Sequence, residues 1–411
     1  MTGLRCRSCD APLDHVFVDL GASPLSNRYL GAGELTHMEP TYPLKVFVCT
    51  TCWLVQLPPV VAPDHLFADY AYFSSYSDSW LKHAERYVED MTARLDLTPS
   101  HTVVEIASND GYLLQFFARR KIRVLGVEPA ANVAAAAEAK GIPTLVRFFG
   151  STTGDEMVRA GQTADLLLGN NVLAHVPDLN DFIAGMKRIL KPRGVITMEF
   201  PHLLRLMESN QFDTIYHEHY SYFSFLAAEE AFKRHGIRLF DVEELRSHGG
   251  SLRIFGEHAE DGSHPASGRT DAMRKREADF GLDRLEGYRA FGQQVEDTKR
   301  ALLAFLIDAK GGGRHIAGYG APAKGNTLLN YCGIRTDFLD YTVDRSEHKQ
   351  GRFLPGSRIP IFAPEKIRET KPDYVLILPW NLREEIAEQM GHIRTWGGRF
   401  VVPIPRVEVL P

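Results

Sequence analysis

Apolar and polar positions follow a regular order along much of this chain, most clearly between residues 101 and 256. Short apolar runs at TVVEIA, VLGVEP and ADLLLGNN are separated by segments with helical spacing, one containing LLQFFARR and one rich in alanine. Strands and helices in this order are typical of a parallel, doubly wound sheet. A helix over residues 79–95 is predicted before it, because apolar side chains recur there at i, i+3 and i+4.

The C-terminal third shows a second pattern of the same kind. Residues 260–276 are polar and contain DGSHPASG, which indicates a solvated linker or surface loop. An amphipathic helix with apolar positions from Leu282 to Phe305 follows, and three glycines at 311–313 end it. The runs HIAGYGAPAKGN, DYTVDRS, DYVLILPW and RFVVPIP then predict another α/β unit. We therefore expect an α/β chain with a small module at 1–65, a Rossmann-like domain at 66–258, and a linker, long helix and Rossmann-like domain at 259–411.

Composition and charge narrow the possible functions. The 411 residues are 44% hydrophobic and 24% charged, which suits a globular protein and excludes a fibrous or disordered one. A net charge of −5 supplies no basic field, so we expect no nucleic-acid partner. No apolar run approaches the ~20 residues of a membrane span, and the N-terminus lacks a signal peptide's apolar core. We expect no membrane association and a cytoplasmic location.

Four of the five cysteines form two pairs with the same short spacing. Cys6 and Cys9 make one C-x-x-C knuckle, and Cys49 and Cys52 make the other. Two such knuckles complete the tetrahedral thiolate shell that structural zinc prefers, with no position open for a substrate. Two disulfides fit a reducing cytoplasm less well. We predict a structural Zn²⁺ in the first module, and a buried, unreactive thiol at Cys332.

A turn suited to a nucleoside follows the first strand of the central domain. It contains one glycine where a pyrophosphate-binding turn has three, which argues against a dinucleotide there. Glu128 ends the next strand, where a carboxylate can accept hydrogen bonds from both ribose hydroxyls. In the alternative reading, Asn109 and Asp110 merely cap a helix and Glu128 is a surface acid. The residues predicted to hold an adenosyl ligand are Glu105, Ala107, Asn109, Asp110, Gly111, Glu128, Asn170 and Asn171.

A second glycine turn, GYGAPAK at residues 318–324, opens the C-terminal unit. Lys324 could reach a phosphate from this turn, and Asp344 stands where an acid meets the ribose of a dinucleotide. However, Ala323 occupies the third glycine position and Pro322 removes one N–H donor. A full NAD site is therefore less consistent with the sequence than a fold that has lost it.

Taken together, these motifs resemble a known family, the three-domain S-adenosylmethionine-dependent sugar C-methyltransferases. Those enzymes add branch methyl groups to nucleotide-linked deoxysugars, and the resemblance covers essentially the whole chain. It rests on the paired knuckles, E-I-x-x-N-D-G at 105–111, the E-P after the second strand, N-x-x-x-H-x-P at 171–177, E-H-x-x-x-F-S at 218–224, H-G-G at 248–250 and G-Y-G-A-x-A-K at 318–324. Ala107 departs from methyltransferases at large, where a glycine is usual. The resemblance implies S-adenosylmethionine as methyl donor and a nucleotide-diphosphate sugar, most commonly dTDP-linked, as substrate.

The densest group of titratable side chains is YHEHY at residues 216–220. Methylation at carbon needs a base that removes a proton next to a ketone and a donor that stabilises the enolate oxygen. The resemblance implies that His219 is this base, acting at C3 of a 4-keto-6-deoxysugar. Glu218 would orient it or compete as the base, Tyr216 is a candidate donor, and His217 could exchange roles with His219. Residues predicted to contact the substrate are Tyr72, Tyr76, His175, His248 and Lys324.

The residues leave two other kinds of function open. An N- or O-methyltransferase would use the same adenosyl site and need no enolate. Tandem Rossmann-like units with a zinc knuckle could also form a dinucleotide-dependent reductase or a nucleotide-binding scaffold.

Overall fold

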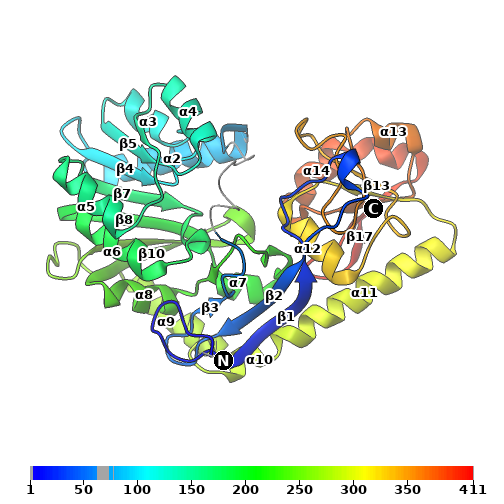
Figure 1. The fold of residues 1–411 in the computed structure, drawn as a ribbon, viewed down its shortest axis with the longest axis horizontal. Helices are drawn as coiled ribbons and strands as arrows, with labels where there is room; N and C mark the ends of the chain where they lie inside the picture. The colour runs from blue at the N-terminus through cyan, green and yellow to red at the C-terminus, as the bar shows by residue number, and fades with distance from the viewer. Residues whose placement is uncertain (1–2, 63–73, 77, 411) are drawn as a thin grey trace. The chain divides into compact units, whose positions relative to one another are not determined.

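The computed structural model describes residues 3–62, 74–76 and 78–410 of the chain (Figure 1). By their contacts the residues form two compact units, each built from several stretches. Unit 1 comprises Met1–Asp14, Val48–Leu203 and Tyr220–Leu285, and unit 2 comprises His15–Phe47, Leu204–His219 and Glu286–Pro411. All three regions expected from the sequence contribute to both units, and their boundaries at 65 and 258 stay a prediction.

Unit 1 is built on a seven-stranded sheet of the expected doubly wound kind. Its strands are β4 (Thr102–Ile106), β5 (Arg123–Val127), β6 (Thr144–Leu145), β7 (Ala164–Asn170), β8 (Leu190–Pro201), β10 (Ile237–Leu245) and β11 (Ser251–His258). The strand order is β10-β11-β8-β7-β4-β5-β6, parallel from β8 to β6, with β11 antiparallel to both its neighbours. The order reverses between β4 and β7, and ligands bind at the carboxyl ends of strands beside such a point.

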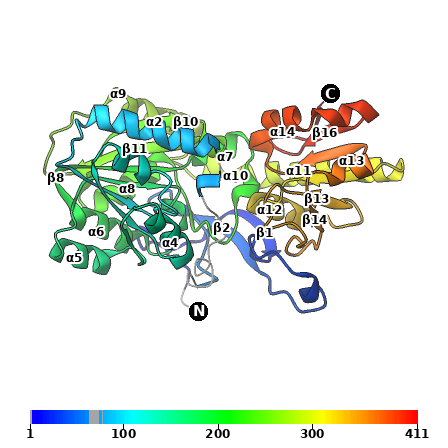
Figure 2. The ribbon, with the colours of Figure 1, turned by 90° about the horizontal axis from the view of Figure 1, so that it is seen from above.

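Helices cover both faces of this sheet, as Figure 2 shows for α2 and α9 on one side and α5 and α6 on the other. They are α2 (Asp78–Arg94), α3 (Leu114–Arg119), α4 (Ala131–Ala139), α5 (Ser151–Arg159), α6 (Leu179–Ile189), α8 (Phe225–Arg234) and α9 (Gly268–Phe280), with short helical turns η2 (Ser74–Tyr76), η3 (Leu173–His175) and η5 (Ser247–Gly249). Helix α2 confirms the helix expected over 79–95. Its buried residues Ala84, Tyr87, Val88 and Met91 pack on Phe117 of α3 and Phe255 of β11 in one core.

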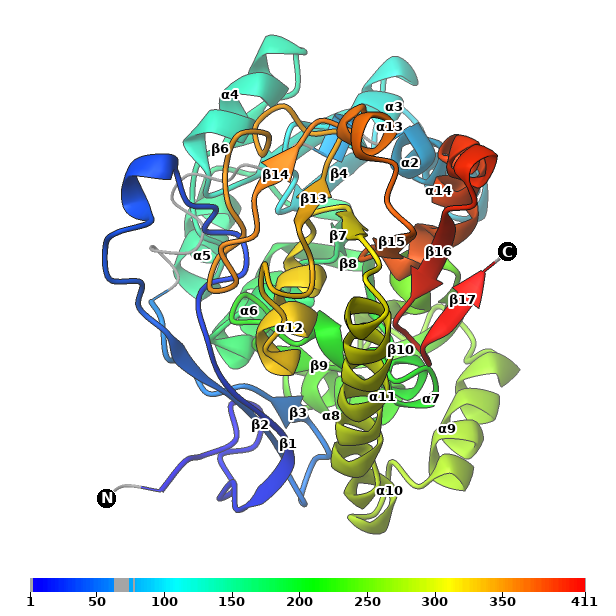
Figure 3. The ribbon, with the colours of Figure 1, turned by 90° about the vertical axis from the view of Figure 1, so that its right-hand side faces the viewer.

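Unit 2 carries the second α/β sheet. Its strands are β12 (Ile316–Tyr319), β13 (Tyr341–Val343), β14 (Ile361–Phe362), β15 (Tyr374–Ile377), β16 (Arg399–Val402) and β17 (Glu408–Leu410), in the order β14-β13-β12-β15-β16-β17. All are parallel except β17. The helices are α7 (Leu203–Glu208), α10 (Glu286–Arg289), α11 (Phe291–Gly311), α12 (Ala323–Cys332), α13 (Lys366–Thr370) and α14 (Arg383–Gln389). Figure 3 shows α11 beside α12, and the Rossmann-like prediction is confirmed.

Shorter elements complete each unit. Strands β1 (His15–Ser23) and β2 (Tyr42–Val48) are neighbours in a sheet, and β3 (Val55–Gln56) pairs antiparallel with β9 (Ser221–Tyr222) in unit 1. Unit 2 also has the helical turns η1 (Ala32–Glu34), η4 (Phe212–Thr214), η6 (Trp380–Leu382) and η7 (Gly391–Trp396). Among the described residues, none of the helices has the length and apolar character needed to cross a bilayer.

Two predictions for residues 260–310 are wrong in detail. The stretch expected to be a linker contains helix α9, because Thr270, Met273 and Glu277 are buried against the rest of unit 1. Glu277 accepts hydrogen bonds from the backbone N–H groups of Phe225 and Leu226 at the start of α8, a tertiary contact that outweighs the polar local sequence. The amphipathic helix also begins later than expected, because Gly281 at φ 102° ends α9 and turns follow.

Candidate functional site

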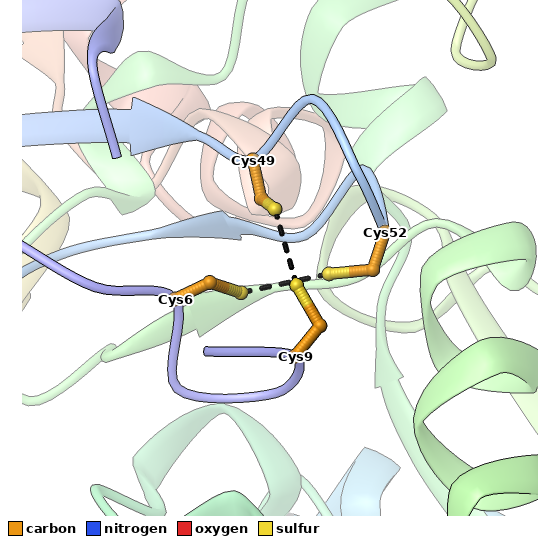
Figure 4. A group of neighbouring side chains, drawn as sticks. All are labelled: Cys6, Cys9, Cys49 and Cys52. Carbon is orange, nitrogen blue, oxygen red and sulfur yellow. Dashed lines mark hydrogen bonds between the residues drawn. The ribbon is translucent and has the colours of Figure 1, made fainter. Parts of the chain in front are cut away.

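The four paired cysteines converge in unit 1 (Figure 4). Their sulfur atoms all lie within 4.8 Å of one another, with Cys6 Sγ 3.5 Å from Cys52 Sγ and Cys9 Sγ 3.4 Å from Cys49 Sγ. Zn–S bonds of ~2.3 Å in a tetrahedron separate sulfur atoms by about 3.8 Å, so the cluster has the size of a four-thiolate metal shell. The Gln56 side chain donates to Cys6 Sγ at 3.1 Å and the Thr51 N–H donates to Cys49 Sγ at 3.4 Å. Such donors orient thiolate ligands, so the residues fit a thiophilic metal.

The turn after β4 alternates in backbone conformation. Its φ angle is 56° at Ala107, 49° at Asn109 and 73° at Gly111. Alternation of this kind produces a concavity in which backbone N–H groups face a polar or anionic group. The left-handed conformation favours glycine and costs alanine about 1 kcal/mol. The usual glycine at the position of Ala107 therefore has a backbone reason, in addition to the space it leaves.

Glu128, directly after β5, accepts backbone hydrogen bonds that hold the turn after β4 in place. One carboxylate oxygen accepts the N–H of Asn109 and the other that of Ala130, both at 3.0 Å. Asn109 Oδ1 in turn accepts the Ser74 N–H at 2.9 Å, and Lys140 Nζ donates to Asp110 Oδ2 at 2.9 Å. Each oxygen of Glu128 keeps a second lone pair, so hydrogen bonds from ribose hydroxyls stay possible.

Other predicted adenosyl-site residues lie at the same sheet edge. Asn170 ends β7, and the Asn171 N–H donates to the Glu199 carbonyl at 2.7 Å. Asp110 Oδ1 and Asn171 Oδ1 are buried acceptors with no hydrogen-bond partner among the described residues. Unsatisfied buried acceptors call for a donor, which ribose hydroxyls and amines supply. The residues therefore fit an adenosyl ligand, and their individual roles stay a prediction.

Glu105, also predicted for this site, lies within the sheet on β4. It has no exposed surface, and burial raises its pKa well above the usual range, although the Tyr112 hydroxyl opposes this shift. A role for Glu105 in holding the adenosyl ligand stays a prediction.

In unit 2, Tyr216 and His219 form a hydrogen-bonded pair. His219 Nδ1 lies 2.8 Å from the carbonyl oxygen of Thr214, and His219 Nε2 lies 2.8 Å from Tyr216 Oη. A carbonyl only accepts, so Nδ1 carries the proton in the neutral ring and Nε2 accepts from the tyrosine hydroxyl. The basic nitrogen is thereby fixed as Nε2, and the residues are only half-buried. The pair can accept a proton at Nε2 and donate one from Oη.

Glu218 and His217, next to this pair, are held differently. Asn27 Nδ2 donates to Glu218 Oε1 at 2.7 Å, and burial raises the pKa of Glu218 to about 7. His217 Nε2 lies 3.2 Å from the Pro43 carbonyl, its ring packs edgewise on Tyr42, and burial lowers its pKa. The His217 ring is thus engaged by the β2 strand, whereas Glu218 titrates near neutral pH and keeps the chemistry of an acid or a base.

Lys324, at the start of α12, belongs to a cluster with a buried acid. Asp213 has no exposed surface and accepts the indole N–H of Trp380 at 2.7 Å. Lys324 Nζ lies 4.5 Å from the centroid of that indole and donates to Asn381 Oδ1 at 2.6 Å. Burial raises the pKa of Asp213 to about 7, with Lys324 opposing, and burial lowers the pKa of Lys324. The lysine is therefore held over an aromatic face beside a weakly ionised acid.

We expect Asp213→Asn to remove a pH-dependent cost in stability. The folded-state pKa of about 7 lies above the ordinary value, so ionising Asp213 costs stability increasingly as pH rises from about 4 to about 7. Asparagine keeps an acceptor for Trp380 and cannot ionise. Relative to wild type, urea unfolding of the variant should show a gain of about 3 kcal/mol between pH 5 and pH 8. Parallel stability curves would contradict the assignment; Lys324 and Cys332 are the titratable neighbours to control.

The dinucleotide-type turn after β12 is held by hydrogen bonds from other residues of the same unit. Asp344 Oδ2 accepts the Ala321 N–H at 2.7 Å, and the Ala321 carbonyl accepts from Tyr29 Oη at 2.6 Å and Lys349 Nζ at 3.0 Å. Asp344 thus binds its turn in the way that Glu128 binds the turn of unit 1, and its carboxylate oxygens keep lone pairs for a ribose. That this unit lacks a full NAD site stays a prediction from Pro322 and Ala323.

The remaining predicted substrate residues that the structure describes lie on three short helical turns of unit 1. His175 ends η3 and is half-buried, and His248 is exposed at η5 in unit 1. The side chain of Tyr76 is 75% exposed. Tyr72 lies outside the described residues. A substrate role for each stays a prediction.

Sequence reasoning missed several residues that hold the candidates. Asn27, Thr214 and Trp380 bond Glu218, His219 and Asp213, but each lies in an irregular segment without periodicity. Glu199, on β8, was not among the predicted site residues. Its charge inside the apolar run ITMEFP was the one available signal.

Three family models match successive parts of this chain. A family model described as a methyltransferase domain matches residues 80–242, the region that contains the turn after β4 and strands β4 to β8 of unit 1. The chain is thus an S-adenosylmethionine-dependent methyltransferase. A model described as a C-methyltransferase C-terminal domain matches residues 246–405, and one described as a putative zinc binding domain matches residues 6–67. The chain belongs to the three-domain, S-adenosylmethionine-dependent C-methyltransferase family.

One relative matches the chain over nearly its full length, and two other proteins match part of it. C-methyltransferase NovU of Streptomyces niveus is 37% identical over 99% of this chain and 96% of its own length. A ubiquinone biosynthesis O-methyltransferase of Rhizobium etli strain CIAT 652 is 32% identical over 23% of this chain and 38% of its own. The structure of magnesium protoporphyrin IX methyltransferase from Synechocystis PCC 6803 matches with a TM-score of 0.35 at 12% identity, covering 43% of this chain and 82% of that one. Family membership decides against the N- or O-methyltransferase and reductase alternatives.

Proposed function

We propose that this enzyme methylates C3 of a nucleotide-diphosphate-linked 4-keto-6-deoxysugar, with a dTDP sugar as the first candidate. The observation that carries the proposal is the fixed tautomer of His219, whose basic Nε2 is paired with the Tyr216 hydroxyl. A base and a donor on one short segment are what enolate formation requires. A C-methyltransferase transfers its methyl group to carbon, so the reaction needs a carbon nucleophile. The choice of a sugar as substrate rests on the resemblance of the motifs.

In the proposed mechanism, His219 Nε2 accepts the C3 proton as the C–H bond breaks. The electron pair forms an enolate, and the Tyr216 hydroxyl turns its proton from Nε2 to the enolate oxygen, which frees the Nε2 lone pair for the C3 proton. Bound S-adenosylmethionine supplies an electrophilic methyl group on a sulfonium leaving group. With the donor bound, C3 of the enolate would form the new C–C bond to this methyl group, and the sulfur would keep the electron pair of the S–CH₃ bond. Glu218, held by Asn27, orients the segment or shares the proton.

The residues proposed to hold the methyl donor belong to unit 1. The turn from Ala107 to Gly111 would hold the methionine moiety, Glu128 the ribose, and Asn170 with Asn171 the neighbouring polar groups. In unit 2, Lys324 would contact the diphosphate from the first turn of α12, where the helix start also favours anions. A local site of this kind is needed because the net charge of −5 gives no general attraction.

We further propose that the four cysteines bind one Zn²⁺ with a structural role. Four thiolates fill its coordination sphere, so the metal would take no part in the chemistry. Its contribution would be to join the knuckle at 6–9 to the knuckle at 49–52.

The function is tested by offering the enzyme S-adenosylmethionine with a panel of 4-keto nucleotide-sugars, with the 4-hydroxy sugars as matched controls. We expect a new methyl carbon on C3 in product NMR with the 4-keto members alone. The enzyme without methyl donor should also exchange the C3 hydrogen in deuterated water. Methylation of a 4-hydroxy control, or a methyl group on oxygen or nitrogen, would overturn the proposal.

A further inference from the structure

Glu199 is a buried carboxylate for which the proposed reaction has no role. It lies near the carboxyl end of β8 with no exposed surface. Its oxygens accept hydrogen bonds from His83 Nε2 and Arg253 Nη2, each at 2.9 Å, and from Ser247 Oγ at 2.7 Å. Burial would raise its pKa, but these partners lower the pKa to about 2, so the carboxylate is ionised. Three donors on one buried anion make a rigid centre.

This centre lies beside the predicted adenosyl residues. In the register of β7 with β8, Asn170 is opposite Glu199, and the Asn171 N–H donates to the Glu199 carbonyl at 2.7 Å. Ligands of doubly wound sheets bind outside this edge, near the reversal between β4 and β7. The backbone of Glu199 is therefore part of the sheet edge, and any residue bonded to its side chain is fixed relative to that edge.

Its side chain holds the H-G-G loop between β10 and β11. The loop has three consecutive left-handed residues, with φ of 53° at His248, 88° at Gly249 and 118° at Gly250. Histidine rarely adopts this conformation, so the surroundings must impose it. The Ser247 hydroxyl anchors the loop to Glu199, while the Ser247 carbonyl accepts the Gly250 N–H at 2.8 Å.

The ring of His248 is also linked to Glu199, through the aromatic rings of Trp80 and His83. Trp80 on α2 stacks on His83, a Glu199 partner, with ring centroids 4.8 Å apart and planes at 16°. His248 packs edgewise on the same Trp80 at 5.1 Å. The backbone of His248 is therefore fixed through Ser247 and its ring through His83 and Trp80, although the side chain is exposed. A side chain that is exposed yet doubly oriented suits contact with a ligand.

We propose that Glu199 and Ser247 are positioning residues that hold the H-G-G loop so that His248 contacts the acceptor sugar. The inference rests on the proposed function for its acceptor sugar, and on the sequence prediction that His248 contacts this acceptor. It adds the residues that fix His248 and the prediction that they affect the acceptor and leave the methyl donor unaffected.

The same sheet offers a matched control for a merely structural role. Asp241 on β10 is likewise a buried carboxylate, bound by Arg94 and Arg269, and it accepts a hydrogen bond from Ser267 Oγ. Ser267→Ala therefore removes a serine–carboxylate bond of the same kind as Ser247→Ala. The two variants should lower the unfolding temperature by similar amounts.

The experiment compares Ser247→Ala, Ser267→Ala and Ser247→Thr with wild type in the full-length protein. We expect Ser247→Ala to lower kcat/KM for the acceptor at least 10-fold, chiefly through KM, with affinity for S-adenosylmethionine by calorimetry unchanged within 2-fold. Ser267→Ala should keep wild-type kinetics, and threonine at 247 should restore most of the loss. Equal kinetics of the two alanine variants, or a loss that resides in donor affinity, would overturn the inference.

A double-variant cycle separates this inference from the proposed function. His248→Ala should reduce kcat/KM as much as Ser247→Ala, and the double variant should be no worse than His248→Ala, because both changes remove one contact. Additive losses would overturn the positioning role. The cycle is measured on whichever acceptor the wild type methylates, so a failure of the 4-keto sugar assignment appears in the wild type and leaves the cycle interpretable.

Discussion

Replacing His219 by alanine is expected to reduce C3-hydrogen exchange in deuterated water by about 100- to 10,000-fold, the usual contribution of a positioned general base. Without methyl donor, exchange reports proton removal alone. The expectation follows from the hydrogen bonds to Thr214 and Tyr216, which leave Nε2 as the basic atom of the ring. Exchange is followed by NMR of the recovered nucleotide-sugar, and methyl transfer should fall at least in parallel.

Two neighbouring variants identify the base. His217→Ala should keep exchange within about 10-fold of wild type, since that ring is engaged by Pro43 and Tyr42. Glu218→Gln keeps an acceptor for Asn27 and loses the proton that titrates near pH 7, so exchange should fall modestly and lose any inflection there. If His219→Ala exchanges normally while Glu218→Gln does not, the carboxylate is the base and the assignment to His219 is wrong.

The success of sequence reasoning follows from where the signals lie. Strands such as β4 and β7 and helix α2 bury continuous or periodic apolar faces, so their patterns fix their type. The four-cysteine cluster was predictable because two C-x-x-C knuckles carry the ligand set in their spacing. The parallel pairing of most strands in both sheets follows from the alternation of strands and helices in each unit.

What could not be predicted depends on contacts between distant residues. Helix α9 looks polar because its anchor is one buried glutamate, Glu277, whose partners Phe225 and Leu226 lie some fifty positions earlier. The tautomer of His219 depends on the Thr214 carbonyl, a backbone group with no sequence signature. The loop role of Glu199 likewise requires Ser247 and His83, which lie far from it on either side in the sequence.

Cysteine replacement offers the largest expected effect on stability. Cys49→Ser removes one of four converging thiolates. The three that remain cannot complete the tetrahedral shell of a structural zinc site. Structural zinc contributes about 10–16 kcal/mol of apparent binding energy in zinc-finger peptides, and much of that stabilises the fold. We expect zinc content to fall from one ion per chain towards zero, and the unfolding temperature to fall by on the order of 10 °C.

Cys332→Ser is the matched control for this experiment. Cys332 is buried in α12, outside the cluster, and burial raises its pKa to about 12, so it stays a neutral thiol that binds no metal. This variant should retain full zinc by plasma emission spectrometry and lose only the stability of one buried sulfur. Exchange of zinc for Co²⁺ should give the absorption of a tetrahedral thiolate site with methyl transfer unchanged, because the metal takes no part in the reaction. The structural role would be contradicted if the wild-type protein, freed of metal and with the four cluster cysteines reduced, unfolded at the same temperature as the zinc-loaded protein.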